Sequence, residues 1–312
     1  MRKILLFSIL GMLMIFAAAC GEESDASGAD SGEQETVTVS HELGETDVPK
    51  NPENVVVFDF GTLDTLDQLG IEVTGIPKGN IPSYLGKYES EDYENVGSLK
   101  EPDFDKLAQI DPDLIIISGR QASLYDQLEE IAPTIHLGVD TTRYMESFKE
   151  NLTTIGSIFD KQDEIDQELQ EIEQSIADLN EKASSSNTNA LIVLANDDKI
   201  SAYGPSSRFG LIHDVFGVPA VDEGIEASTH GMNVSFEYVV EQDPEMLYVI
   251  DRGAVVGGES SAKQVVENEL VEKTKAYQND NIVYLNPDYW YLSGGGLVSV
   301  QEMLNEISGS LD

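Results

Sequence analysis

Three arginines, Arg120, Arg208 and Arg252, stand at turns that follow short, largely apolar runs of this sequence. Arginine presents a planar fork of N–H donors and keeps its charge when it leaves water, so a cluster of arginines suits an anionic ligand that is rich in oxygen atoms. Arginine is also scarce, because only one further copy, Arg143, lies beyond the first nineteen residues. The alternative interpretation is that each arginine pairs with a surface carboxylate.

Carboxylates dominate the composition. The 312 residues include 58 Asp and Glu against 18 Lys and Arg, which gives a formal net charge of −40. A chain this acidic is a poor nucleic-acid binder, because clustered Lys and Arg must replace the counterions of the phosphates. A single cysteine excludes an internal disulfide framework and a cysteine-based zinc site, and four scattered histidines argue weakly against a multi-histidine metal site. We therefore expect neither a nucleic-acid partner nor a metal bound by the protein itself.

A local repeat places two of the arginines. Phe104 begins the segment FDKLAQIDPD and Phe236 begins FEYVVEQDPE, and in both segments proline ends a helical pattern before an apolar run. An arginine, Arg120 or Arg252, then follows that run. Ligands of open α/β sheets bind beyond the carboxyl ends of the strands. The repeat therefore predicts two lobes that aim both arginines into one cleft.

Three further residues are candidates for ligand contact. Lys78 and Lys100 stand in loops after strands or turns, where each could equally be a solvated surface lysine. Trp290 belongs to the segment DYWYLSGGG and could lie against an aromatic ligand or cap the core. The glycines after it permit a tight approach and predict a free N-terminus for the final helix, Leu297–Ile307, which would favour an anion.

The elements that must position these residues alternate between strands and helices. Seven short runs rich in Val and Ile are bounded by Gly, Pro or Asp, as buried strands are, and helical patterns separate them. The runs cover residues 55–58, 73–76, 114–117, 135–137, 190–195, 246–250 and 282–285. The helical patterns include 63–69, 104–109, 124–131, 211–216 and 265–274. This alternation predicts α/β layers with mainly parallel sheets.

A long helical pattern divides the folded chain. Within Asp163–Lys182, apolar residues form one stripe opposite an acidic face: Ile165, Leu169, Ile172, Ile176 and Leu179. We predict two Rossmann-like lobes, residues 37–160 and 185–312, joined by a rigid linker helix over residues 161–184, with the ligand cleft between the lobes. The alternative is a surface helix within one domain.

The beginning of the chain is typical of a lipoprotein signal. Two basic residues precede an apolar run, and residues 1–19 end in three alanines before Cys20, the only cysteine. Small residues before a cysteine resemble the lipobox of bacterial lipoproteins, although Ala17 stands where that pattern usually has Leu; an ordinary signal peptide is the alternative. Residues 20–36 contain no aliphatic side chain larger than that of alanine, so they cannot form a buried core. They are expected to form a lipidated cysteine and a disordered tether.

The motifs in order resemble a known family. They are the alanines before Cys20, VVVFDFGTLDTLDQLG, VGSLKEPDFDKLAQIDPDLIIISGR, the long central helix, YGPSSRFGLIHDVFGV, VSFEYVVEQDPEMLYVIDRG and WYLSGGGL. Over residues 45–310 this pattern resembles the iron(III)–siderophore-binding lipoproteins of bacterial ABC importers, and among them the catecholate, petrobactin-type subgroup. The resemblance implies two lobes on a rigid helix. It also implies an extracytoplasmic protein, held at the cell membrane by its lipid anchor alone, that captures a ferric siderophore and delivers it to an ABC permease.

The resemblance further implies roles for single residues. The family's catecholate binders hold the anionic ferric complex with a basic triad, which carried over to this chain is Arg120, Arg208 and Arg252. The siderophore, of catecholate or mixed catecholate–carboxylate type, keeps the iron, so neither a protein ligand to iron nor a cofactor is implied.

Permease docking in the family uses one acidic residue on each lobe. The repeat makes Asp105 and Glu237 equivalent positions, and the resemblance assigns them this role. Glu101 competes with Asp105, because the family commonly has Glu on the N-terminal lobe. On composition alone, these residues are ordinary solvated acids.

Two other classes of function remain open alternatives. The same fold could bind haem, a cobalamin or another iron chelate, and haem would favour a His or Tyr ligand, for which His213 and His230 are the histidine candidates. An extracellular hydrolase is disfavoured, because the sequence has no G-x-S-x-G and no H-E-x-x-H motif. We therefore expect a monomeric binding protein and no enzyme activity.

Overall fold

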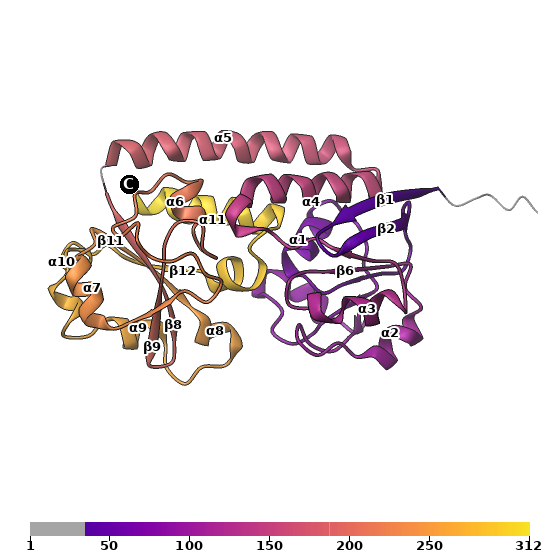
Figure 1. Ribbon diagram of the computed structural model, residues 1–312, viewed down its shortest axis with the longest axis horizontal. Coiled ribbons are helices and arrows are strands. Elements are labelled where there is room, and N and C mark those ends of the chain that lie inside the picture. Colours follow the sequence, from indigo (N-terminus) through magenta and orange to yellow (C-terminus); the bar gives the residue numbers. More distant parts are fainter. Residues whose placement is uncertain (1–34, 187) are drawn as a thin grey trace, which may run out of the picture. The chain divides into compact units, whose positions relative to one another are not determined.

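The computed structural model describes residues 35–186 and 188–312 (Figure 1). The expected signal, residues 1–19, lies outside these residues, as do Cys20 and nearly all of the expected tether. Within the described ranges, no helix combines the length and the apolar character needed to cross a membrane.

The N-lobe is built on a five-stranded sheet in which every neighbouring pair is parallel. Its strands, in the order β5-β4-β3-β6-β7, are β3 (Val55–Val57), β4 (Gly75–Ile76), β5 (Glu94–Asn95), β6 (Leu114–Ile117) and β7 (Thr134–His136). Both β3 and β6 are wholly buried runs of Val, Leu and Ile, as expected for a sheet covered on both faces. One face packs on α1 (Phe60–Gln68) and α4 (Tyr144–Phe159), and the other packs on α2 (Phe104–Ile110) and α3 (Tyr125–Glu129).

The C-lobe has a second five-stranded sheet, in the order β10-β9-β8-β11-β12. Its strands are β8 (Ala190–Asn196), β9 (Lys199–Tyr203), β10 (Met232–Val234), β11 (Met246–Asp251) and β12 (Ile282–Leu285). Strands β8, β11 and β12 are parallel, whereas β9 and β10 are antiparallel to their neighbours.

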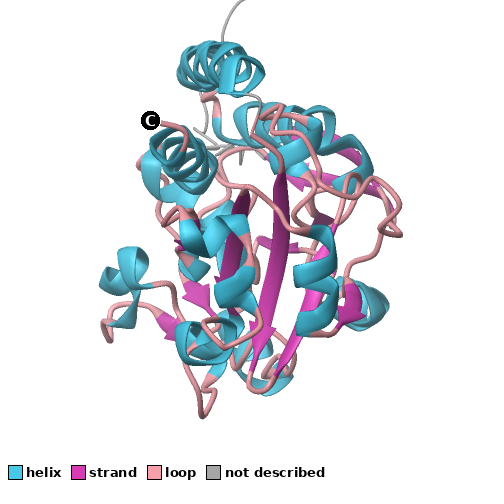
Figure 2. Cartoon of the chain, turned by 90° about the vertical axis from the view of Figure 1, so that its left-hand side faces the viewer, coloured by secondary structure: helices cyan, strands magenta, loops and turns pink. Residues whose placement is uncertain are grey.

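Helices cover both faces of this second sheet, which Figure 2 views from the side of the C-lobe. Alternate residues of β8 and β11 point to opposite faces, so each face has its own apolar layer. One layer includes α6 (Leu211–Asp214) and α11 (Leu297–Ser310), and the other includes α7 (Phe236–Gln242), α9 (Ala262–Val266) and α10 (Lys275–Gln278). The remaining helix, α8 (Arg252–Val256), begins where β11 ends.

The linker helix α5 (Gln162–Ser186) packs on α4 of the N-lobe and on α11 of the C-lobe (Figure 1). Its expected stripe faces inward, with Ile165, Ile172 and Leu179 buried and the other two members partly buried. One continuous apolar cluster therefore includes residues of both lobes and of the linker. The predicted fold class, two α/β lobes with mainly parallel sheets, is confirmed.

Some elements differ from the expectation. An antiparallel hairpin, β1 (Thr36–His41) and β2 (Gly44–Pro49), precedes the first sheet, so residue 36 lies in a strand and not in the tether. Helix α4 was not among the expected patterns. The helix expected over residues 265–274 is interrupted, because the Asn268 side chain accepts hydrogen bonds from the amides of Leu270 and Val271 and so begins a separate 3₁₀ turn, Val271–Lys273.

The first turn of α11 is held by the N-lobe. The Asp64 carboxylate, on α1, accepts hydrogen bonds from the backbone amides of Val298 at 3.3 Å and Ser299 at 3.0 Å. The approach requires glycine at 296, where an added Cβ would stand 2.0 Å from Asp64 Oδ1. The expectation that this helix N-terminus is free for an anionic ligand is therefore wrong, because Asp64 already occupies it.

Candidate ligand-binding site

A cavity of about 600 Å³ is lined by residues of both lobes. The N-lobe contributes Lys100 and Arg120, and the C-lobe contributes Arg208, His230 and Tyr291. A smaller adjoining hollow of about 230 Å³ shares Arg208, His230 and Tyr291 with the cavity and adds Arg252. The two hollows together bring the three arginines of the predicted triad to one site.

Tyr291 contacts all three arginines. Its backbone carbonyl oxygen accepts hydrogen bonds from Arg208 Nη2 at 2.8 Å and from Arg120 Nη2 at 3.2 Å. Its hydroxyl oxygen accepts a hydrogen bond from Arg252 Nε at 2.8 Å. The Arg208 guanidinium also lies over the Tyr291 ring, with its carbon 4.3 Å from the ring centroid, in a cation–π arrangement.

Among the described residues, these three arginines have no carboxylate partner. Within residues 35–186 and 188–312, no Asp or Glu oxygen lies within 4.0 Å of their guanidinium nitrogens. Arg143, in contrast, pairs with Asp140, Glu146 and Glu150 at the surface. The alternative interpretation, an arginine paired with surface acids, therefore describes Arg143 alone. In a chain so rich in carboxylates, three neighbouring cations that pair with none of the described carboxylates form a candidate site for an anion.

The electrostatics of the site agree with this description. Burial lowers the pKa of Arg208, and the positive charge of Arg120 lowers it further. Burial raises the pKa of the Tyr291 phenol, but the hydrogen bond from Arg252 and the charges of Arg208 and Arg252 outweigh burial and hold that pKa below its usual value. An anionic ligand would offset the repulsion among these cations.

The local repeat explains where Arg120 and Arg252 stand. Helices α2 and α7 both end at an Asp in the left-handed region, Asp111 with φ 51° and Asp243 with φ 43°, and proline follows each. Strands β6 and β11 begin shortly afterwards and run parallel to the central strands of their sheets. Arg252 follows β11 directly, and Arg120 follows β6 after a short turn.

Arg208 is positioned by a different kind of element from Arg120 and Arg252. It follows β9, which is antiparallel to β8, so the rule that places sites at the carboxyl ends of parallel strands does not account for it. The loop between β9 and α6 carries Arg208, whose guanidinium also lies 5.3 Å from the ring centroid of its neighbour Phe209. The buried Ser207 hydroxyl ties this loop to the carbonyl oxygen of Gly204 at 2.5 Å.

Two aromatic residues on the turn Asp288–Ser293, Trp290 and Tyr291, have different surroundings. This turn is π-helical, a geometry that often occurs at functional sites. Trp290 is only 4% exposed, donates from Nε1 to Glu306 at 2.7 Å and packs edge-on against Phe216. It reaches the cavity wall but belongs to the core, whereas Tyr291 presents its ring to the arginines. The sequence prediction named Trp290 and missed Tyr291, although the two are adjacent.

Of the two lysines and two histidines that the sequence analysis considered, one of each lines the cavity. Lys100 lines the cavity, whereas Lys78 donates hydrogen bonds from Nζ to the backbone carbonyl oxygens of Glu89 and Ser90 and is not among the lining residues. His230 lines the cavity, whereas His213 bonds the carbonyl oxygen of Val218 at 2.8 Å within α6 and its following turn.

The three candidate docking acids are exposed. Asp105 lies in the first turn of α2 and Glu237 in the first turn of α7, so the repeat gives them equivalent positions on the two lobes. Glu101 is exposed in the loop before α2.

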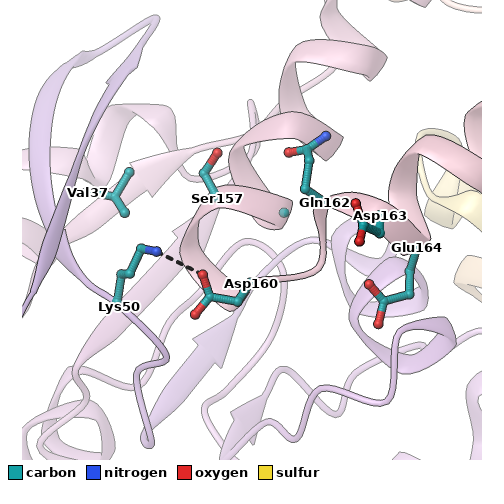
Figure 3. Close-up of a pocket in the computed structure, with 8 residues that line it drawn as sticks. Val37, Lys50, Ser157, Asp160, Gln162, Asp163 and Glu164 are labelled. Carbon is teal, nitrogen blue, oxygen red and sulfur yellow. Dashed lines mark hydrogen bonds and ion pairs between the residues drawn. The ribbon is translucent and has the colours of Figure 1, made fainter.

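A separate hollow of about 450 Å³ lies where β1, the end of α4 and the start of α5 meet (Figure 3). Its only lysine, Lys50, is paired with Asp160 at 2.8 Å, and further carboxylates, Asp163 and Glu164, line it. This hollow therefore does not suit an anion, and it contains none of the predicted site residues. In the part of the chain that the structure describes, no group of three or more His, Cys, Asp and Glu side chains is placed to hold a metal ion.

Two α/β lobes on a linker helix, with an arginine-lined cavity to which both lobes contribute, are typical of a two-lobed solute-binding protein. The chain belongs to the periplasmic binding protein family, whose model matches residues 55–289. Over 316 residues and the full length of both chains, it is 52% identical to the petrobactin-binding protein YclQ of Bacillus subtilis strain 168. It is 30% identical to the ferric-anguibactin-binding protein FatB of Vibrio anguillarum, covering 87% of this chain and 86% of that protein.

Solved structures agree in fold. The crystal structure of Bacillus subtilis YclQ superposes with a TM-score of 0.88 at 55% identity and covers 89% of this chain and 99% of its own. The periplasmic catecholate-siderophore-binding protein VctP from Vibrio cholerae superposes with a TM-score of 0.84 at 34% identity, covering 88% of this chain and 100% of its own.

Proposed function

We propose that this protein captures an anionic ferric siderophore of catecholate or mixed catecholate–carboxylate type and delivers it to an ABC permease for iron uptake. The observation that carries the proposal is that Arg120, Arg208 and Arg252 converge on Tyr291 at two adjoining hollows, with no carboxylate partner among the residues that the structure describes. Deprotonated catechol oxygens of a ferric complex are acceptors for such guanidinium donors. The names of YclQ and VctP, which are petrobactin- and catecholate-siderophore-binding proteins, support this ligand class.

In this proposal, the siderophore holds the iron, and the protein needs neither a cofactor nor a direct iron ligand. The chain acts as a monomer without enzyme activity, anchored through lipid on Cys20 at the extracytoplasmic face of the cell membrane. Asp105 and Glu237, on equivalent helices of the two lobes, dock to the permease, with Glu101 as the competing residue on the N-lobe.

A ligand panel tests the proposal. The purified protein without lipid is titrated with a ferric catecholate, a ferric mixed catecholate–carboxylate chelate, a ferric hydroxamate and haem, and fluorescence quenching of the only tryptophan, Trp290, is followed. We expect saturable quenching by the first two chelates at the lowest concentrations. Saturable quenching by the hydroxamate alone, or by haem alone together with a Soret shift, would contradict the catecholate assignment.

A further inference from the structure

A carboxylate outside the cavity joins the two lobes. Asp288 begins the π-helical turn of the C-lobe, is only 9% exposed and is not among the residues that line either hollow. Its Oδ2 atom accepts hydrogen bonds from the amide of Ser83, at 2.9 Å, and from the Ser83 hydroxyl. Ser83 begins a 3₁₀ helix of the N-lobe, 205 positions earlier in the chain. Asp288 therefore attaches the turn that carries Tyr291 to the opposite lobe.

Other parts of the same turn also lie against the N-lobe. The carbonyl oxygen of Ser293, at its end, comes so close to α1 that a Cβ added at Gly61 would stand 2.2 Å from it. The ring of Tyr289 packs on the ring of Tyr84, with the centroids 4.9 Å apart. The N-lobe therefore contacts the turn on both sides of Tyr291, and the bond to Asp288 is the polar part of this contact.

The contacts of Tyr291 cross the same boundary. Its carbonyl oxygen accepts from Arg208 of the C-lobe at 2.8 Å and from Arg120 of the N-lobe at 3.2 Å. The longer bond already lies at the upper end of the usual range of about 2.7–3.2 Å. A small movement of the turn away from the N-lobe would therefore break the bond to Arg120 first.

Within the C-lobe, the turn has an attachment of its own. Glu306 of α11 accepts a hydrogen bond from Trp290 Nε1 at 2.7 Å. Arg208 and Arg252 belong to the same lobe as the turn, so their contacts with it do not cross the boundary that Asp288 spans. The loss of the Asp288 bond should therefore act on Arg120 and spare the other two arginines.

We propose that Asp288 is a positioning residue of the ligand site, acting through Tyr291 on Arg120. The inference rests on the proposed function and concerns how the site is assembled. By holding the turn against Ser83, Asp288 keeps the Tyr291 carbonyl oxygen within reach of the N-lobe arginine, so Arg120 and Arg208 are held at the cavity before a ligand arrives. Such preorganisation raises affinity, because less ordering remains for the binding step.

The simpler interpretation is that Asp288 only stabilises the fold. Asp288→Ala removes the acceptor, whereas Asp288→Asn retains an oxygen that can accept from the Ser83 amide. Asp113→Ala is the matched control: Asp113 Oδ2 also accepts two hydrogen bonds, from the amides of Glu53 at 3.0 Å and Asn54 at 2.8 Å, but all three residues belong to the N-lobe.

The experiment measures the dissociation constant of a ferric catecholate by calorimetry. We expect D288A to lower the affinity about tenfold, D288N to stay within about threefold of the wild type, and D113A to bind as the wild type does. In an R120A background, D288A should add less than about a twofold loss, because the contact that it supports is already absent. In an R252A background, the loss of about tenfold should persist.

Ser83→Ala repeats the test from the N-lobe. It removes only the hydroxyl donor of an exposed residue and leaves the buried Asp288 in place. We expect S83A to lower the affinity about threefold, and to have no further effect in the R120A background. Melting temperatures establish that every compared variant is folded at the temperature of the titration.

Three results would overturn the inference. Equal losses from D288A in the R120A and R252A backgrounds would make its role one of general stability, and wild-type affinity in both D288A and S83A would deny it any role in the site. Both results leave the proposed function intact. A wild-type protein that binds no ferric catecholate would instead overturn the proposed function, and the positioning role with it.

Discussion

The Arg252 guanidinium donates a hydrogen bond from Nε to the hydroxyl oxygen of Tyr291 at 2.8 Å, and its Nη1 donates to Asn196 Oδ1 at 2.6 Å. Both bonds are made to neutral acceptors, so they orient the guanidinium without cancelling its charge. Tyr291 thus aligns a cation of the C-lobe while its carbonyl oxygen contacts Arg120 of the N-lobe. Because the same carbonyl oxygen also accepts from Arg208, Tyr291 contacts all three arginines of the predicted triad.

The Tyr291→Phe substitution tests this alignment. It removes the hydroxyl that accepts from Arg252 but retains the ring and the backbone carbonyl. We expect the affinity for a ferric catecholate to fall about three- to tenfold, because Arg252 loses one of the two hydrogen bonds that orient its guanidinium and keeps the other, to Asn196. Titration of both proteins measures the change, and Tyr238→Phe, whose hydroxyl donates to Asp222 outside the site, is the matched control. Equal affinities of Y291F and Y238F would show that the hydroxyl does not align Arg252.

The contact between Asp64 and α11 makes stability depend on pH. Burial raises the pKa of Asp64 to about 7, although hydrogen bonds from Ser299, Tyr84 and Val298 act in the opposite direction. In the unfolded chain the pKa returns to about 4, so the folded state binds more protons between about pH 4 and pH 7. The contribution of Asp64 to the free energy of unfolding is therefore greatest below pH 4 and is lost as the pH rises through 7.

Urea denaturation between pH 4.5 and pH 7.5 measures this effect. We expect Asp64→Asn to flatten the fall in stability across that range. At pH 5 it should also cost about 1–3 kcal/mol, because the amide group cannot accept all the hydrogen bonds that the carboxyl accepts. Asp126→Asn, an exposed acid on α3, is the control and should follow the wild type. Parallel pH profiles for D64N and the wild type would contradict the assignment.

Permease docking predicts a separation of binding from transport. Asp105→Ala and Glu237→Ala should leave the affinity for the ferric siderophore unchanged, because both side chains are exposed and neither lines the cavity. Each should reduce uptake of radiolabelled ferric siderophore by cells about tenfold or more, since a charge pair with the permease is lost. Glu101→Ala is made in parallel, and a loss of uptake in E101A with normal uptake in D105A would move the N-lobe contact to Glu101.

Local sequence patterns were sufficient to predict much of the fold. The seven expected strands all form, because runs of buried Val and Ile between turn residues can be recognised within a few residues. The stripe of α5 was visible for the same reason. Helix α4 was missed although its buried Phe148, Leu152, Ile155 and Phe159 follow helical spacing, and the β1–β2 hairpin was missed because it follows directly on a polar, acidic stretch.

The site was predictable where charged or aromatic residues follow strands or turns, as Arg208 and Lys100 do, and most clearly where a motif repeats. The Asp-Pro segments placed Arg120 and Arg252 at strand ends, but the role of Tyr291 depends on contacts with residues 39, 83 and 171 positions away in the sequence. The occupant of the α11 N-terminus, Asp64, is 235 positions from Ser299. No local pattern encodes which of many acids meets which helix, so such pairings become visible only once the chain is folded.

The central claim is that the arginines without carboxylate partners bind the ligand. The most direct measurement is the dissociation constant of a ferric catecholate for Arg208→Ala, with Arg120→Ala and Arg252→Ala beside it and Arg143→Ala as the control arginine that is paired with surface acids. We expect each of the three site variants to lose at least about tenfold in affinity, since hydrogen bonds to charged groups contribute about 1.5–3 kcal/mol, while R143A binds as the wild type does. Wild-type affinity in R208A, R120A and R252A alike would contradict the account.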